Sequence, residues 1–206
     1  MDETIKFEGP MMHQKFWLCA AAALAFTACS SPDDTSTSPS ADAAKTITVS
    51  AEKVEITLID VLDGVTSSYC LDIAGGNKNI DINKGLQAHT CYSYRGEIGT
   101  DQTFTSARFA KGELYMPDFD VCAAAQSLTA GSAIGLAACD GSDLQKVSFS
   151  GSGTISMAGS PDLCFTAAEE SRFGRSQVHQ IKALSLETCS PALAAYQEWR
   201  GRASAD

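Results

Sequence analysis

The sequence predicts an all-β domain built from one structural unit that occurs three times. Six of the eight cysteines recur along the chain as three spaced pairs: Cys70 and Cys91, Cys122 and Cys139, Cys164 and Cys189. Short strand-like runs separated by turn residues fill the same region, a pattern typical of β-sandwiches and barrels. Self-similarity of this kind indicates one supersecondary unit stacked on copies of itself. An even number of regularly spaced cysteines also indicates a disulfide framework, provided that the chain is exported.

Residues 1–28 are predicted to be a signal peptide. Lys15 precedes an apolar run over residues 16–26, which is too short to span a bilayer and suits a signal-peptide core. The run ends in Phe-Thr-Ala before Cys29 and a polar tail, which resembles a bacterial lipoprotein signal. That resemblance implies cleavage before Cys29 and lipidation of this cysteine. Phe26 stands where an aliphatic residue is commoner, so cleavage by the ordinary signal peptidase stays an alternative.

Two further interpretations concern the N-terminal region. Residues 1–10 are charged and precede Met11-Met12, and we interpret them as a mis-started extension. The alternative for residues 16–26 is a buried core helix. Residues 29–45 contain almost no large apolar side chain, so they cannot bury enough surface to offset the entropy of ordering. They are predicted to be a flexible tether to a single domain over residues 46–206.

Charge and cysteine use limit the partners and the compartment. The chain carries a formal net charge of −10, which repels phosphate backbones and predicts no nucleic-acid partner. Attraction to anionic lipid is excluded in the same way, so membrane attachment is predicted through the lipid anchor only. The predicted localisation is the bacterial cell envelope, on the outer membrane or the periplasmic face, and otherwise secretion. Such oxidising surroundings allow disulfides to form.

The strand signals follow one another along the domain. Residues 54–58 (VEITL) alternate apolar and polar side chains, the period of a half-buried strand. Shorter runs at 148–150, 154–157 and 184–186 do the same. Turn residues at 63–64, 75–77, 140–141 and 151–153 separate such runs. The alanine-rich stretches 122–126 and 191–195 are compatible with short helices but do not change the class. Residues 169–172 are expected to form a solvated, charged turn.

Each of the three units ends in a similar triplet. A glutamine, any residue and a large apolar residue follow the second cysteine in Gln102-Thr103-Phe104, Gln145-Lys146-Val147 and Gln197-Glu198-Trp199. Together with the cysteines, these triplets resemble the ricin-type β-trefoil lectin family over about residues 54–200. The mark of that family is Cys-apolar-Asp, then an alternating strand that ends in Cys, then Gln-x-Trp, three times over.

The resemblance implies a β-trefoil of three disulfide-containing repeats. It implies pairing within each repeat, Cys70–Cys91, Cys122–Cys139 and Cys164–Cys189, and each ring would contribute about 3 kcal/mol to stability. Phe104 and Val147 stand where the family has a core tryptophan, and Phe149 or Leu144 is expected to fill the gap beside Val147. Closure of three units into a barrel also removes exposed sheet edges.

The first repeat contains a complete set of sugar-binding groups. The resemblance places Asp72 at the family's carboxylate position, two residues past Cys70. Gln87 and His89 alternate on one strand and so face the same side; His89 stands where the family has an aromatic platform. In the pair after the second cysteine, Asp101 would bond sugar hydroxyls and Gln102 would brace the site. Tyr92 and Tyr94 could widen the stacking surface. The predicted carbohydrate-binding residues are Asp72, Gln87, His89, Asp101 and Gln102.

Three alternatives stay open for these residues. Asp72 could be a turn residue before Gly75, and His89 an exposed strand histidine without a ligand. Asp101 and Gln102 could be purely structural. The other two repeats lack the set, with Ala124, Gly135 and Ala137 in the second repeat and Thr166, Ser185 and Glu187 in the third. The sequence therefore predicts one competent pocket and two degenerate ones.

The predicted function is non-catalytic carbohydrate binding in the cell envelope. A glycan is the expected partner, and no enzyme activity, cofactor or metal is predicted. The chain has no C-x-x-C motif, which argues against a zinc ribbon and a redox dithiol. The alternative is an interaction or structural module that contacts another envelope protein. A third hypothesis is an enzyme or a protease inhibitor on the same fold.

Overall fold

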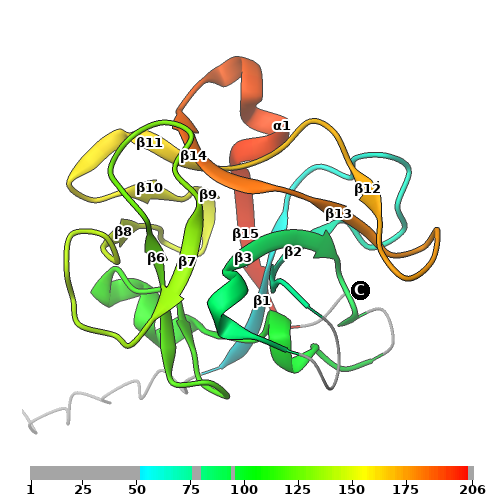
Figure 1. Ribbon diagram of the computed structural model, residues 1–206, viewed down its shortest axis with the longest axis horizontal. Helices are drawn as coiled ribbons and strands as arrows, with labels where there is room; N and C mark the ends of the chain where they lie inside the picture. Colours follow the sequence, from blue (N-terminus) through cyan, green and yellow to red (C-terminus); the bar gives the residue numbers. More distant parts are fainter. Residues whose placement is uncertain (1–51, 76–79, 94–95, 204–206) are drawn as a thin grey trace, which may run out of the picture. The chain divides into compact units, whose positions relative to one another are not determined.

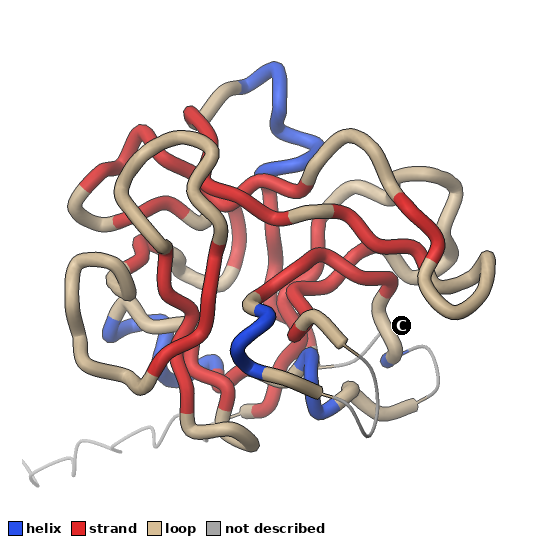
Figure 2. Tube along the Cα trace, viewed as in Figure 1, coloured by secondary structure: helices blue, strands red, loops and turns tan. Residues whose placement is uncertain are grey.

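The computed structural model describes residues 52–75, 80–93 and 96–203. The predictions for the signal peptide, the lipidated Cys29, the tether and Tyr94 lie outside the described residues. The described part is an all-β structure in which strands dominate and the helical segments are short turns (Figure 2). The predicted fold class is therefore confirmed at the level of secondary structure. Within this part of the chain, no helix has the length and apolar character needed to cross a bilayer.

The largest sheet contains the strands of the first repeat and connects them to strands of the other repeats. Its members are β1 (Lys53–Leu58), β2 (Tyr69–Ile73), β3 (Leu86–Thr90), β4 (Phe104–Thr105), β9 (Ser152–Thr154), β12 (Arg172–Phe173), β13 (Gln180–Lys182) and β15 (Glu198–Arg202). The strands are ordered β12-β13-β3-β2-β1-β15-β9, and β4 also pairs with β1. The two outermost strands on one side, β12 and β13, come from the long loop of the third repeat.

Two smaller antiparallel sheets hold the other repeats. The second repeat forms the sheet β5-β6-β7, with β5 (Tyr115–Met116), β6 (Val121–Ala125) and β7 (Ile134–Ala137). The third repeat lies in the sheet β14-β11-β10-β8, with β10 (Ser156–Met157), β11 (Ser160–Ala167) and β14 (Leu184–Thr188), and β8 (Val147–Ser148) begins in the triplet that ends the second repeat. The short helices are η2 (Ile82–Lys84), η4 (Thr100–Gln102), η5 (Ser106–Lys111), η6 (Pro191–Leu193) and α1 (Ala194–Gln197).

The three repeats are arranged around a common centre. The hairpins β2–β3, β6–β7 and β11–β14 lie on three sides of the molecule, and β1 and β15 pass between them (Figure 1). In each hairpin the first strand carries the opening cysteine of its repeat. The disulfides are Cys70–Cys91, Cys122–Cys139 and Cys164–Cys189, with Cα–Cα distances of 5.0, 5.1 and 5.1 Å. The predicted pairing within repeats is confirmed.

The large residues of the three triplets meet in the core as predicted. Phe104, Val147 and Trp199 are all buried. Trp199 is 0% exposed, and its indole Nε1 donates to the carbonyl oxygen of Phe165 at 3.0 Å. Phe149 also lies in the core, whereas Leu144 is exposed, so only Phe149 is placed to compensate for the small Val147. The core therefore tolerates three different side chains at equivalent positions.

The structure departs from the sequence predictions at two segments. Residues 122–126 lie in and just after strand β6 and are not helical, because their alanines pack as a buried strand against β5 and β7. Residues 169–172 are exposed, as expected of a solvated turn, but the last of them, Arg172, begins β12, the first strand of a hairpin with β13. β13 pairs in turn with β3, through Ile181 opposite His89 and Lys182 opposite Ala88. This cross-repeat contact brings the third repeat to the predicted site of the first.

Candidate functional site in the first repeat

The β2–β3 hairpin and helix η4 bring the predicted polar residues together. Asp72 lies directly opposite Gln87 in the antiparallel register, so their side chains share one face. Gln87 Nε2 donates to Asp72 Oδ1 at 2.8 Å, and Gln102 Nε2, from η4, donates to Asp72 Oδ2 at 3.0 Å. Asp72 is therefore a strand residue, and the alternative that it belongs to a turn is wrong.

This polar network is buried. The five predicted site residues are between 0% and 6% exposed, and Asp72 is fully covered. Burial raises the pKa of the Asp72 carboxyl well above its ordinary value, and the nearby Asp101 carboxylate raises it further. The hydrogen bonds from Gln87 and Gln102 act in the opposite direction because they favour the charged form. Burial likewise raises the pKa of Asp101, against a lowering backbone hydrogen bond.

The raised pKa of Asp72 predicts a pH-dependent stability. A carboxyl whose pKa is higher in the folded than in the unfolded chain stabilises the fold fully below its unfolded value, near 3.8, and this stabilisation is lost as the pH rises through the folded value. Asp72→Asn removes the titrating group and nearly preserves its shape. We expect the free energy of unfolding of the wild type, relative to Asp72→Asn, to fall over the pH range upward from about 4. Urea denaturation of both proteins across this range measures it, and a difference independent of pH would contradict the assignment.

Gln102 has the same bracing role as its counterparts in the other repeats. Its Oε1 accepts from the backbone N–H of Tyr92 at 3.0 Å, and its Nε2 donates to the Thr90 carbonyl at 3.3 Å. Gln145 makes the matching bonds to the N–H of Asp140 and the carbonyl of Ala138, and Gln197 to those of Ser190 and Thr188. Each glutamine thus ties its triplet to the residues flanking the second cysteine. In the first repeat alone, this amide also bonds a carboxylate.

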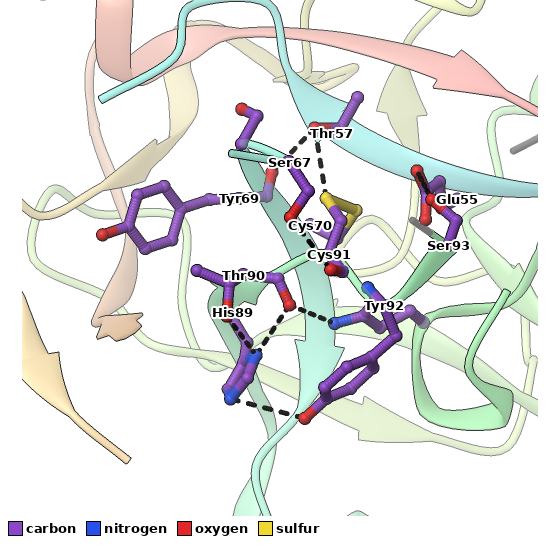
Figure 3. The surroundings of a disulfide bond; sticks show 12 residues. Glu55, Thr57, Ser67, Tyr69, Cys70, His89, Thr90, Cys91, Tyr92 and Ser93 are labelled. Carbon is purple, nitrogen blue, oxygen red and sulfur yellow. Dashed lines mark hydrogen bonds between the residues drawn. A yellow bond between two sulfur atoms is a disulfide. The ribbon is translucent and has the colours of Figure 1, made fainter. Parts of the chain in front are cut away.

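Three aromatic rings gather at one side of the network. The ring of His89 lies 5.0 Å from that of Tyr92 and 5.5 Å from that of His179, centroid to centroid (Figure 3 shows the first pair). His89 Nδ1 lies 2.8 Å from the carbonyl oxygen of Thr90, which can only accept, so this nitrogen carries the proton. The other nitrogen then accepts from the Tyr92 hydroxyl at 3.3 Å. Burial lowers the pKa of His89, which keeps the ring neutral near pH 7.

His89 is buried, so it does not offer the open ring face that the sequence analysis expected of it. The alternative of an exposed strand histidine is wrong, because His89 is buried. Its ring also offers little open surface on which a sugar could stack. Tyr92 and His179, beside it, are half-buried, so the solvent-facing ring surface of the cluster belongs to these two residues.

The third repeat contributes two residues that the sequence analysis missed. Arg172 Nη2 donates to Gln87 Oε1 at 3.5 Å, and His179 packs near His89 and Tyr92. These residues lie far along the chain from the first repeat and outside its motif. One signal pointed toward them: the third repeat has the longest spacing between its cysteines, 25 residues against 17 in the second. The extra residues form the β12–β13 hairpin.

Two cavities adjoin the cluster. One, of about 500 Å³, is lined by Tyr92 and by residues of the loop that leads into η4, from Gly96 to Thr100. Gly99 fits tightly there, because a Cβ at this position would lie 2.8 Å from both Asp101 Oδ1 and the Tyr92 ring. The second cavity, of about 420 Å³, lies between residues 64–67 and the turn of the third-repeat hairpin, and includes Thr90 and Gln180.

The equivalent positions in the other repeats hold no comparable network. Ala124 faces Gly135 in the second repeat, and Thr166 faces Ser185 in the third. Thr166 Oγ1 accepts from Gln197 Nε2 at 2.9 Å, so a hydroxyl takes the place that a carboxylate oxygen has in the first repeat. Glu187 Oε1 accepts from Ser185 Oγ at 2.7 Å. A carboxylate held by two glutamine amides is thus found in the first of the three repeats.

One group of side chains in the described residues has the spacing of metal ligands. Ligand atoms of Glu55, Cys70 and Cys91 lie within 4.8 Å of one another. Both sulfurs are joined in a disulfide, however, and a disulfide offers no thiolate. This cluster is therefore part of the structural framework of the first repeat (Figure 3).

Comparison with known proteins supports the fold. No protein-family model and no curated protein matches this sequence. Among solved structures, an agglutinin from Abrus precatorius matches with a TM-score of 0.52 and 16% identity, over 73% of this chain and 48% of the agglutinin. A designed threefold-symmetric protein, ThreeFoil, matches with a TM-score of 0.49 and 15% identity, over 75% of this chain and 98% of that one.

The match to the agglutinin concerns the architecture only. The chain spans about half the length of the agglutinin, and at such low identity the likeness shows the fold and not the activity. With its three hairpins, three disulfides and threefold arrangement, the domain is a β-trefoil, as the resemblance implied.

Proposed function

We propose that the domain binds carbohydrate through its first repeat and catalyses no reaction. The observation that carries this proposal is the Asp72 carboxylate, held by amides of Gln87 and Gln102 beside Asp101 and a cluster of three rings. A carboxylate can accept about four hydrogen bonds, and two are used within the protein. The remaining acceptor positions suit the hydroxyls of a sugar, since charge-assisted hydrogen bonds are strong. Ring faces contribute apolar contact with the C–H face of a sugar.

The ligand would approach across the more open members of the site. Because Asp72 and Gln87 are covered, contact with them requires a shift of the groups above them. Tyr92, His179 and Arg172 border the network and are half-buried or exposed. The agglutinin that shares this fold supports a lectin-like role, which we carry over as part of the proposal. Gln87 and Asp101 are proposed as sugar contacts and Gln102 as the brace.

A glycan screen tests this function. The mature chain, made soluble by Cys29→Ser, is applied to a panel of mono- and oligosaccharides, and a hit is titrated by calorimetry. Binding of at least one sugar supports the proposal. No binding across neutral and acidic sugars alike contradicts it.

A second candidate function is docking to another envelope protein. Large apolar side chains are exposed on the third-repeat hairpin: Phe173 is 63% and Val178 68% exposed. Exposed apolar side chains that lie together are typical of interaction sites. If the glycan screen is silent and the protein captures an envelope protein that Phe173→Ser releases, this function replaces the first.

We also propose attachment to the bacterial cell envelope through a lipid on Cys29, with release into the medium as the alternative. The apolar run before Ala28-Cys29-Ser30 motivates this proposal. A signal of this type yields a mature chain that begins at the lipidated cysteine. Intact-mass analysis of membrane-extracted protein is expected to show a diacylated or triacylated N-terminus on Cys29. Unmodified protein that begins elsewhere would contradict the anchor.

A further inference from the structure

We infer that the first-repeat site is completed by the third-repeat hairpin β12–β13, and that Arg172 on this hairpin directs the site toward acidic sugars. This inference rests on the proposed function and names its ligand class. The chemical class is a saccharide that carries a carboxylate, such as a hexuronate. The residue that would recognise it lies outside the repeat motif.

The hairpin is fixed to the first repeat. β13 pairs with β3, the strand that carries Gln87 and His89. Lys182, fully buried, places its Nζ 2.8 Å from Asp63 Oδ2 and donates to the Glu169 carbonyl at 2.6 Å. The Tyr69 hydroxyl donates to Gln180 Oε1 at 3.0 Å. These contacts hold the hairpin at the site as part of its wall.

Arg172 is positioned on the open side of the network. Its guanidinium reaches Gln87 Oε1 at 3.5 Å, while the other end of the same amide is bound to Asp72. The side chain is exposed, and among the ion pairs between described residues none involves Arg172. A guanidinium has five N–H donors, so most of its bonding capacity is free for a ligand.

The neighbouring charges are compatible with an anion at this point. The Gln87 amide separates Arg172 from the Asp72 carboxyl, because its oxygen accepts from Arg172 and its nitrogen donates to Asp72. The imidazole of His179 lies beside the ring cluster, with its centroid 5.9 Å from that of the Tyr92 ring, and its nitrogens are further polar groups for a ligand. The net charge of −10 is spread over the whole chain, and salt screens its distant part beyond about 10 Å.

The chemistry of an arginine paired with a carboxylate explains why acidic sugars would bind more tightly than neutral ones. A guanidinium fork binds a carboxylate through two parallel, charge-assisted hydrogen bonds. A neutral hexose offers a hydroxymethyl group at the position of the carboxylate, and the uncharged oxygen of this group forms neither the paired hydrogen bonds nor the ion pair. Arg172 therefore distinguishes two sugars that are otherwise the same, while the Asp72 network binds the hydroxyls that both share.

Paired sugars test the inference. Galacturonate against galactose, and glucuronate against glucose, are titrated into the mature chain with Cys29→Ser. We expect one acid to bind about five- to tenfold more tightly than its neutral partner. Arg172→Ala is expected to bring this ratio to about one, because the acidic sugar loses more affinity than the neutral sugar, and Arg172→Lys is expected to restore part of the ratio. Raising the ionic strength from about 0.1 to about 1 M should lower the ratio, because the Debye length falls from about 10 to about 3 Å.

Arg175→Ala is the matched control. Arg175 is an exposed arginine in the turn of the same hairpin, and its replacement is expected to leave the ratio unchanged. A ratio near one in the wild type, or a ratio that Arg172→Ala does not change, overturns the inference and leaves the proposed function standing. If no sugar of the two pairs binds, the inference is overturned. If the wider glycan screen also finds no binding, the proposed function is overturned as well.

Discussion

Asp72→Ala is expected to weaken sugar binding about ten- to a hundredfold. The substitution removes the acceptor at the centre of the site and leaves ligand hydroxyls unpaired, a loss of roughly 1.5–3 kcal/mol. Each 1.4 kcal/mol corresponds to about a factor of ten in affinity. The loss should exceed that of His89→Ala, because a ring contributes apolar contact, which is weaker than a hydrogen bond to a charged acceptor. Calorimetric titration of the sugar found in the screen measures both.

The control for this prediction is Glu187→Ala. Glu187 is a carboxylate on the equivalent strand of the third repeat, bonded to Ser185 and to no glutamine amide. We expect it to leave the affinity unchanged. Asp72→Ala also leaves the Gln87 amide without its carboxylate partner, so thermal unfolding must show that the variant is folded under the titration conditions. Equal affinity of the wild type and a folded Asp72→Ala would place the site elsewhere, and a loss on Glu187→Ala would show that the third repeat binds.

Trp199→Ala is expected to lower the free energy of unfolding by about 3–5 kcal/mol. Removal of a large, fully buried aromatic side chain costs the transfer energy of its atoms and that of the cavity left behind. Trp199 is 0% exposed, and its indole N–H satisfies the Phe165 carbonyl, which the substitution also leaves without this donor. The loss is a large share of the 5–15 kcal/mol that is typical of a domain.

Phe173→Ala provides the comparison, because this phenylalanine is 63% exposed. Its replacement should change stability by less than about 0.5 kcal/mol, as for most surface substitutions. Urea denaturation of both variants, with the disulfides intact, is followed by far-ultraviolet circular dichroism, since Trp199→Ala removes the domain's tryptophan. A loss below about 1 kcal/mol for Trp199→Ala would mean that the core collapses onto the missing ring.

The repeat architecture could be predicted from the sequence, because its determinants are local. The pairing of Cys70 with Cys91 depends on two strands joined within 21 residues, and the other two pairs follow the same rule. The burial of Phe104, Val147 and Trp199 follows from their place three times in the same triplet. Even the meeting of Asp72 and Gln87 is a matter of hairpin register within one repeat. Periodicity and spacing record such short-range relations.

The tertiary structure decided the environment of the site. That Asp72 and His89 are covered depends on what packs above them, and no property of their own strands reveals it. Arg172 is 85 residues from Gln87, and Gln180 is 111 from Tyr69, yet both pairs are in contact. These contacts arise because β13 adds to the free edge of β3, and an edge strand accepts any neighbour whose backbone it can pair with. The packing of whole repeats determines that β13 is the strand that pairs with β3. Interactions such as that of the buried Lys182 with Asp63 stabilise this arrangement, and they leave no pattern in the sequence.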